Sequence, residues 1–205
     1  MRIRISSRIP ATSTIRVGSI SLLLTLVLVA CQQTPYNKYQ SLVKAELASS
    51  HRVDSLFLGM SLGMTARDFY MHCWDMNKRG LFTDGESNTA VLYKLPTGLK
   101  FPASMNFYPE FTNGRVSTMG VSFRYDGWAP WNKHLGSDSL RDDVVHLLEQ
   151  WYPHTNPFIK MEDDERGIIY VKVDGNRRII VGSYDNAYVK VVYTDMSVEN
   201  QLTIN

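Results

Sequence analysis

The chain has 205 residues, 44% of them hydrophobic, and its 22 Lys and Arg against 20 Asp and Glu give a formal net charge of +2. This length can bury enough apolar surface for one domain, or for two small similar ones, without disulfides. The small net charge, with no cluster of Lys and Arg on one expected element, argues against nucleic acid as a partner.

The first 30 residues have the organisation of an export signal. Residues 1–16 carry four Arg and no acid, and residues 17–30 are uncharged and mostly aliphatic, like the n-region and h-region of a signal peptide. These fourteen apolar residues cover ~21 Å as a helix, less than the ~30 Å of a bilayer core. A permanent transmembrane helix is therefore the weaker interpretation. Removing the four Arg leaves 18 basic against 20 acidic residues, a net charge of −2.

The junction Leu28-Val29-Ala30-Cys31 resembles the lipobox of bacterial lipoproteins. The resemblance implies that Cys31 receives a diacylglyceryl group, that the chain is cut before it, and that its new amine is acylated, for example with palmitate. Gln32 stands where retention in the inner membrane requires Asp, which implies the outer membrane of the cell envelope. The leaflet stays open at this point, and the domain is expected to face the periplasm. An ordinary cleaved signal with a chance Cys at its end is the alternative.

Residues 31–37 are expected to form a lipidated tether that contains Pro35. A short amphipathic helix is expected next, over 37–50, because apolar side chains recur there at helical spacing. Lipidation of Cys31 would leave Cys73 without a disulfide partner within the chain.

The next helix is expected to begin at Thr65, because Thr65 and Asp68 form a capping-box pair. Phe69, Cys73 and Met76 share one face of this helix, and Gly80 ends it. Three strands are expected to follow, over 90–95, 100–108 and 115–125, the last two joined by the turn-forming pair Asn113-Gly114.

The second half repeats this order of elements. Ser139 and Asp142 predict a second helix cap, an apolar stripe runs from Leu140 to Trp151, and Pro153 ends the helix. Four strands are expected after it, over 158–162, 168–173, 177–184 and 188–194, joined by short turns that make them antiparallel neighbours.

The predicted fold class is therefore α+β: two successive units of one helix followed by an antiparallel β-meander, preceded by a short N-terminal helix. The signal peptide covers 1–30 and the α+β domain 38–205, with two similar halves at about 55–130 and 137–198. Gly63-Met64-Thr65, followed by Asp68 and Phe69, resembles the repeat of β-lactamase-inhibitor-like proteins and of small lipoproteins of outer-membrane assembly. That resemblance implies a non-enzymatic domain that presents a sheet face or a loop to another protein.

The sequence contains no motif for a metal, a cofactor or a catalytic nucleophile. The five His residues have no ligand spacing, and the acidic run 162–165 lacks the pattern of a calcium loop, so a solvated turn is the better interpretation. Cys73 is expected to turn inward as a structural residue. We therefore expect no cofactor and no enzyme activity, although a hydrolase with dispersed site residues is a third hypothesis.

The loop after the first meander carries the least ordinary pattern, Tyr125-Asp126-Gly127-Trp128-Ala129-Pro130-Trp131. Trp128, Trp131 and Tyr125 are the candidate binding residues, because indoles exposed in a loop form protein hot spots or stack on sugars. The favoured alternative is that both indoles seal the junction between the halves. A protein-interaction module is the first functional hypothesis, and a binder of glycan or of a small envelope ligand is the second.

Overall fold

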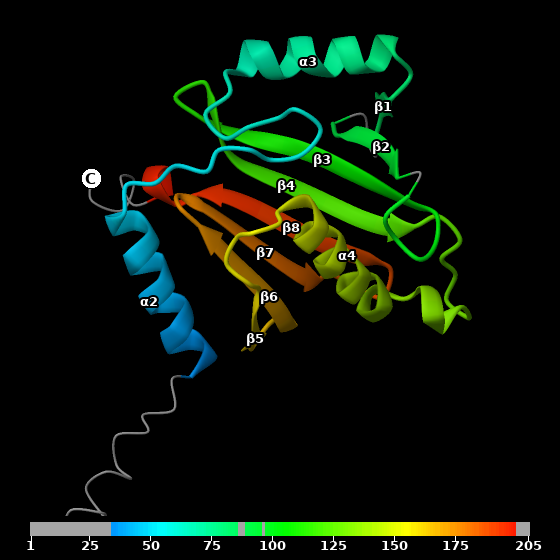
Figure 1. The fold of residues 1–205 in the computed structure, drawn as a ribbon. Helices are drawn as coiled ribbons and strands as arrows, with labels where there is room; N and C mark the ends of the chain where they lie inside the picture. The colour runs from blue at the N-terminus through cyan, green and yellow to red at the C-terminus, as the bar shows by residue number, and fades with distance from the viewer. Residues whose placement is uncertain (1–33, 86–88, 96, 200–205) are drawn as a thin grey trace, which may run out of the picture. The chain divides into compact units, whose positions relative to one another are not determined.

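The computed structural model describes residues 34–85, 89–95 and 97–199 (Figure 1). Its helices are α2 (Pro35–Ala48), α3 (Ala66–Lys78), η2 (Lys133–Leu135) and α4 (Ser137–Trp151). Its strands are β1 (Phe82–Asp84), β2 (Val91–Leu95), β3 (Ala103–Thr112), β4 (Arg115–Tyr125), β5 (Ile159–Asp163), β6 (Gly167–Asp174), β7 (Arg177–Ser183) and β8 (Tyr188–Asp195).

The strands form one antiparallel sheet in the order β1-β2-β3-β4-β8-β7-β6-β5. Each half contributes a four-stranded meander, and the two meanders join through their last strands, where Val121 of β4 pairs with Val191 of β8. The predicted α+β class, with a helix before each meander, is confirmed. The sequence did not predict the pairing of β4 with β8, which joins the halves into one sheet.

The two halves also share the way in which each helix is attached to its sheet. Before α3, Gly63 N–H donates to Val116 O at 2.8 Å and Ala66 N–H donates to Gly114 O at 2.9 Å, at the β3–β4 hairpin. Before α4, Ser137 N–H donates to Asn186 O at 3.0 Å, at the β7–β8 hairpin. In each half, the segment that opens the helix is therefore bonded to the last hairpin of its own meander.

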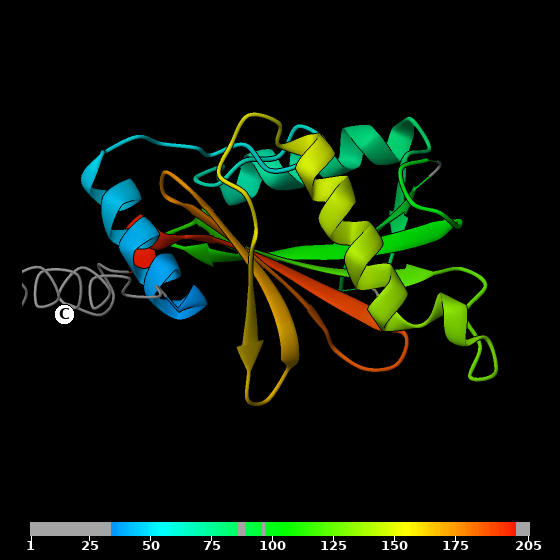
Figure 2. The ribbon, with the colours of Figure 1, turned by 60° about the horizontal axis from the view of Figure 1, so that its bottom comes forward.

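Helices α3 and α4 pack on one face of the sheet and form the main core with it (Figures 1 and 2). The alternation of β4 supplies this core, because every second residue from Met119 to Tyr125 is fully buried. Helix α2 packs on the opposite face over β5 and β6, where its apolar residues cover a second cluster around Ile169, Val171 and Val173. The expected short N-terminal helix is confirmed, with bounds two residues earlier than predicted.

The first predicted cap is confirmed. The Thr65 hydroxyl oxygen accepts from Asp68 N–H at 3.1 Å and donates to the Asp68 carboxylate at 2.7 Å. Phe69 and Met76 face the core as predicted, and Gly80 follows the helix with φ +70°.

The second predicted cap is wrong. Helix α4 begins at Ser137 with Gly136 as N-cap, and no side chain bonds to its first amides. Ser139 lies exposed inside the first turn, because the bond from Ser137 N–H to the neighbouring hairpin fixes the start of the helix.

The strand pattern was largely predictable, with one omission. The turn Asn113-Gly114 has φ +52° and +72°, as a tight two-residue hairpin turn requires. Strand β1 was not predicted, because three residues are too few to show a periodicity.

The expected signal peptide, the lipobox and Cys31 lie outside the described residues. Within the described part of the chain, no helix is both long and apolar enough to cross a membrane.

Candidate functional site

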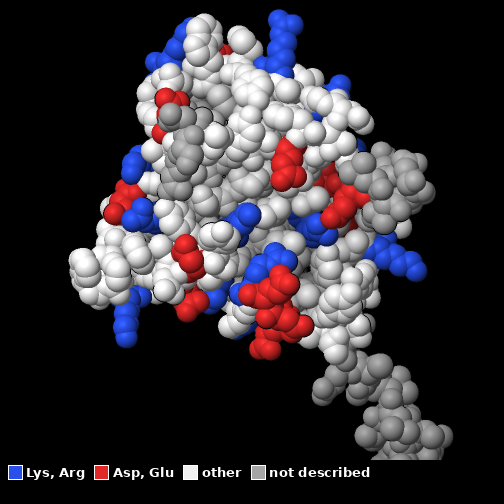
Figure 3. Space-filling model, turned by 180° about the vertical axis from the view of Figure 1, so that it is seen from behind, with Lys and Arg blue, Asp and Glu red and all other residues white. Residues whose placement is uncertain are grey.

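In the part of the chain that the structure describes, no helix packs on one side of the sheet between β2 and β8. We call this surface the open face; it consists of the side chains of β2, β3, β4 and β8 that alternate with the core residues. Register places them in rows across the strands: Lys94, Ser104, Arg124 and Tyr188 form one row, and Leu92, Asn106, Ser122 and Lys190 form the next. Figure 3 shows the molecule from behind: basic and acidic side chains are both spread over this side, with uncharged side chains between them.

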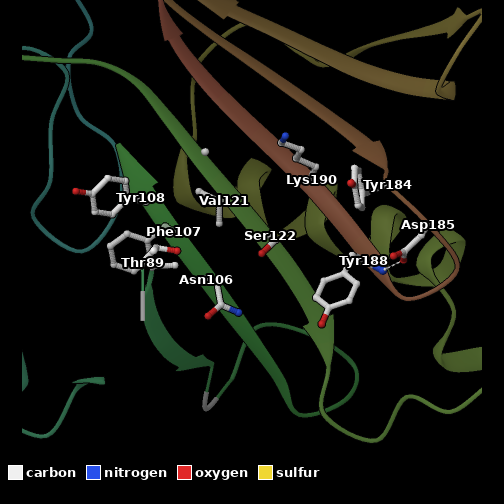
Figure 4. Close-up of a pocket in the computed structure, with 12 residues that line it drawn as sticks. Thr89, Asn106, Phe107, Tyr108, Val121, Ser122, Tyr184, Asp185, Tyr188 and Lys190 are labelled. Atoms are coloured by element: carbon white, nitrogen blue, oxygen red, sulfur yellow. Dashed lines mark hydrogen bonds between the residues drawn. The ribbon is translucent and has the colours of Figure 1, made fainter. Parts of the chain in front are cut away.

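The centre of the open face is a hollow of about 520 Å³. Gly120 and Ser122 form its floor, because Gly120 has no side chain and the side chain of Ser122 is short. Tyr108 lies on one side of it and Tyr188 and Lys190 on the other, and the Tyr108 hydroxyl points outward, away from Ser122 (Figure 4). Tyr184 and Asp185, from the β7–β8 turn, complete the rim. The rim of the hollow therefore carries phenol rings, one ammonium group and one carboxylate.

The rim aromatics are accessible to a partner. Tyr184 is 73% exposed and Tyr108 is 43% exposed. Lys190 Nζ lies 5.9 Å from the ring centroid of Tyr184, and Tyr108 shares a hydroxyl hydrogen bond of 2.7 Å with Tyr70 of α3. Tyr, Trp and Arg are the residue types enriched at protein interfaces.

A polar cluster lies beside the hollow, on the row of Lys94. Lys94 Nζ donates to Ser104 Oγ at 2.7 Å and to the Asp126 carboxylate at 3.1 Å, and Ser104 Oγ also donates to Asp126. Burial alone would raise the pKa of Asp126, but hydrogen bonds from Ser104 and Lys94 outweigh it and lower this pKa below its ordinary value. Lys94 is thus a cationic donor paired with a carboxylate. A general base needs a free lone pair, and Lys94 Nζ instead donates hydrogen bonds to Ser104 and Asp126.

Arg124 is the central side chain of the same row. Its guanidinium carbon lies 5.5 Å from the ring centroid of Trp128 and 5.5 Å from that of Tyr188. The planar cation is therefore within cation–π distance of two aromatic rings. The side chain lines a hollow of about 760 Å³ together with Trp128 and Lys133.

The three candidate residues of the Trp loop have different environments. Trp131 is 83% exposed, so the alternative that both indoles seal the junction is wrong for this ring. Trp128 is half-buried against the core and donates its indole N–H to Asn186 O at 3.1 Å. Tyr125 is fully buried and donates to Asp143 at 2.5 Å. The prediction of Tyr125 as a binding residue is therefore wrong, because its alternation with Arg124 turns it into the core.

The remaining reactive groups have structural environments. Cys73 is half-buried against the core, and burial raises its pKa to about 11, so the thiol is protonated at neutral pH. His72 Nε2 is hydrogen-bonded to Leu58 O at 2.7 Å. In the part of the chain that the structure describes, no three His, Cys, Asp or Glu residues are grouped to hold a metal ion.

Sequence reasoning identified the Trp loop and missed Arg124, Lys190, Tyr184 and Tyr188. The alternation of β4 already places Gly120, Ser122 and Arg124 on one face. Their connection to Tyr188 and Lys190 depends on the pairing of β4 with β8, which no local pattern predicts.

No protein-family model, curated protein or solved structure matches this chain.

Proposed function

We propose that this chain is a lipid-anchored protein of the bacterial envelope whose globular part is a non-catalytic protein-interaction module. The open face carries this proposal, because the exposed rings of Tyr108 and Tyr184 lie with Lys190 around a hollow that no helix of the described chain covers. Arg124 lies beside this hollow, in the row of Ser104 and Tyr188. Exposed Tyr and Arg side chains are enriched at protein interfaces.

The anchor is proposed from the lipobox-like sequence that ends at Cys31. Three residues separate Cys31 from Pro35, where α2 begins, so the lipid would hold α2 within ~14 Å of the membrane surface. An outer-membrane location is part of the proposal, because Gln32 follows Cys31, and we propose that the domain faces the periplasm.

Lipid attachment is tested by labelling cells with radioactive or alkyne palmitate and recovering the protein. The native chain should carry label and sediment with membranes, whereas Cys31→Ser should carry none and leave the membrane fraction. Equal labelling of both chains would refute the anchor.

The interaction is tested by mild crosslinking in cells and detergent pull-down of the full chain. Trp131→Ala and Tyr184→Ala remove two of the most exposed rings near the open face. Trp74→Ala is the matched control, since Trp74 is 54% exposed but belongs to α3. The proposal expects one protein to be captured by the native chain and by the control, and lost in the two face variants. Equal capture by all four chains would contradict it.

The second candidate is a binder of glycan, favoured by one observation. The hollow of about 760 Å³ is lined by Trp128 and by polar groups of Asn132 and Asp138, and the exposed Trp131 lies next to these lining residues in the sequence. An indole with polar neighbours is a common sugar platform. Calorimetric titration with peptidoglycan and lipopolysaccharide fragments separates the two candidates, because saturable heat lost in Trp131→Ala would favour the glycan.

A hydrolase with dispersed site residues is the third candidate, and nothing in the open face favours it. Its most suggestive hydroxyl, Ser104, is hydrogen-bonded to Lys94 and Asp126, which form an ion pair at 3.1 Å. Turnover of any chromogenic ester or amide that Ser104→Ala abolishes would revive this candidate.

A further inference from the structure

The side chain of Arg124 is held in place by its neighbours in the sheet. Register sets Arg124 opposite Ser104 on β3 and Tyr188 on β8, and the rings of Trp128 and Tyr188 flank its guanidinium at 5.5 Å each. A guanidinium that is already ordered loses little conformational freedom when it binds a ligand.

Arg124 uses little of its hydrogen-bonding capacity inside the protein. Its five N–H donors make one side-chain bond among the described residues, from an Nη atom to the Tyr188 hydroxyl at 3.4 Å. Its Nε is covered and has no acceptor in this part of the chain. No acidic group of the described chain lies within salt-bridge distance of it, whereas Arg52, Arg141 and Arg177 all have such a partner.

The nearby acids are occupied by other donors. Asp126 accepts from Ser104 and Lys94, Asp185 accepts from the backbone N–H groups of Ala187 and Tyr188, and Asp138 pairs with Arg141 at 2.8 Å. Among the described residues, no carboxylate is therefore bonded to Arg124, although its charge helps to lower the pKa of Asp126. Lys133 adds a second cation to the hollow of about 760 Å³.

Two hollows of the surface meet at Arg124. One of about 760 Å³ lies toward Trp128, Ala129 and Pro130, and another of about 430 Å³ lies toward Ser104 and Asn106. A ligand can thus reach the guanidinium from outside, and it meets apolar surface on one side and polar groups on the other.

We infer that Arg124 is the binding site for a carboxylate of an acidic segment of the protein partner, with Trp128 and Tyr188 as its walls. This inference rests on the proposed interaction function and names the chemistry of the partner. The planar fork of a guanidinium matches a carboxylate with two parallel hydrogen bonds. The aromatic and Pro-lined walls fit the apolar side chains of a peptide, and a bare phosphate would leave them uncovered.

The site can be tested in the native protein without its partner. The probe is an amidated peptide of alternating Glu and Gly, and the matched control is the same peptide with Gln for Glu. Because Arg124 Nε is covered, its N–H signal should be resolved in a proton–nitrogen correlation spectrum, assigned by its loss in Arg124→Lys. The Glu peptide should move this signal saturably and the Gln peptide should leave it in place. An unmoved signal at millimolar Glu peptide would overturn the inference.

Variants supply the second readout. Arg124→Gln should weaken binding of the Glu peptide by about tenfold or more, and Arg124→Lys by less, since the charge remains but the fork is lost. Lys160→Gln on β5 is the control and should bind like the native protein. The assignment to protein carboxylates would be overturned if Arg124→Gln bound the Glu peptide as tightly as the native protein does. It would also be overturned if inorganic phosphate, or vesicles of phosphatidylglycerol, moved the Arg124 signal as far as the Glu peptide does.

Failure here can be told from failure of the proposed function. If Arg124→Gln captures the same partner in cells as the native chain while Trp131→Ala does not, the interaction module stands and the carboxylate site is wrong.

Discussion

The Tyr125 hydroxyl donates a hydrogen bond of 2.5 Å to the Asp143 carboxylate and so joins the last strand of the first half to the helix of the second. Asp143 is 5% exposed and also pairs with Lys100 Nζ at 3.1 Å. Burial alone would raise the pKa of Asp143, but the hydrogen bonds from Tyr125 and Lys100 outweigh it and lower this pKa. Burial and the bond to Asp143 together raise the pKa of Tyr125, so the pair consists of a phenol and a carboxylate.

Tyr125→Phe should destabilise the protein by about 1–3 kcal/mol, because it leaves a buried carboxylate with one donor fewer. Urea unfolding of the domain followed by circular dichroism measures this change. Tyr184→Phe is the control: Tyr184 is 73% exposed, and its free energy of unfolding should stay within about 0.5 kcal/mol of the native value. A Tyr125→Phe protein as stable as the control would show that the bond contributes nothing.

Acid should destabilise the fold through three carboxylates. The pKa values of Asp126, Asp143 and Asp195 are all lowered, because hydrogen bonds outweigh the effect of burial. Such groups contribute stability that is fully present above their unfolded pKa, about 3.9, and is lost as pH falls through the lower folded pKa. The urea midpoint should therefore fall as pH drops below about 4.

Asp143→Asn tests the cause of that acid sensitivity. The variant should be less stable at neutral pH, and its urea midpoint should fall less steeply in acid than that of the native protein. A parallel fall in both proteins would mean that Asp143 does not contribute to the pH dependence.

The two helix starts should respond differently to loss of a hydroxyl. Thr65→Ala removes the acceptor of Asp68 N–H and should cost about 1 kcal/mol. Ser139→Ala changes an exposed residue that caps nothing, and its effect should stay within about 0.5 kcal/mol. Thermal unfolding of both variants checks this, and equal losses would mean that Ser139 has the capping role that its sequence pattern suggested.

The two loop indoles should separate stability from binding. Trp128→Ala should lower the free energy of unfolding by about 1–3 kcal/mol, because it removes packing on the core and a bond to Asn186 O. Trp131→Ala should leave stability within about 0.5 kcal/mol of native and should reduce capture of the partner. Calorimetric unfolding and pull-down of the same preparations measure both effects, and a destabilised Trp131→Ala protein would contradict the environment assigned to Trp131.

Local patterns predicted most of the elements because the energies that form them are local. The Thr65 cap, the alternation of β4 and the Asn113-Gly114 turn each depend on residues within a few positions of one another. Ser139 failed as a cap because the competing contact, from Ser137 to Asn186, comes from a hairpin almost 50 positions away in the sequence.

The candidate site was less predictable than the fold. The pattern Tyr125 to Trp131 suggested three surface aromatics, but the pleat that exposes Arg124 buries Tyr125. Arg124 and Tyr188 become neighbours only when β4 pairs with β8, so this row of the open face forms only in the tertiary structure.

The most direct test of the interaction account places a photoreactive residue at Ser122, on the floor of the open face, in the full chain in bacterial cells. A second chain carries it at Glu149, an exposed position on α4. Irradiation should join the Ser122 chain to one envelope protein, the added Tyr184→Ala substitution should abolish that product, and the Glu149 chain should not form it. The same product from both positions, or none from Ser122, would contradict the claim that the open face binds a protein.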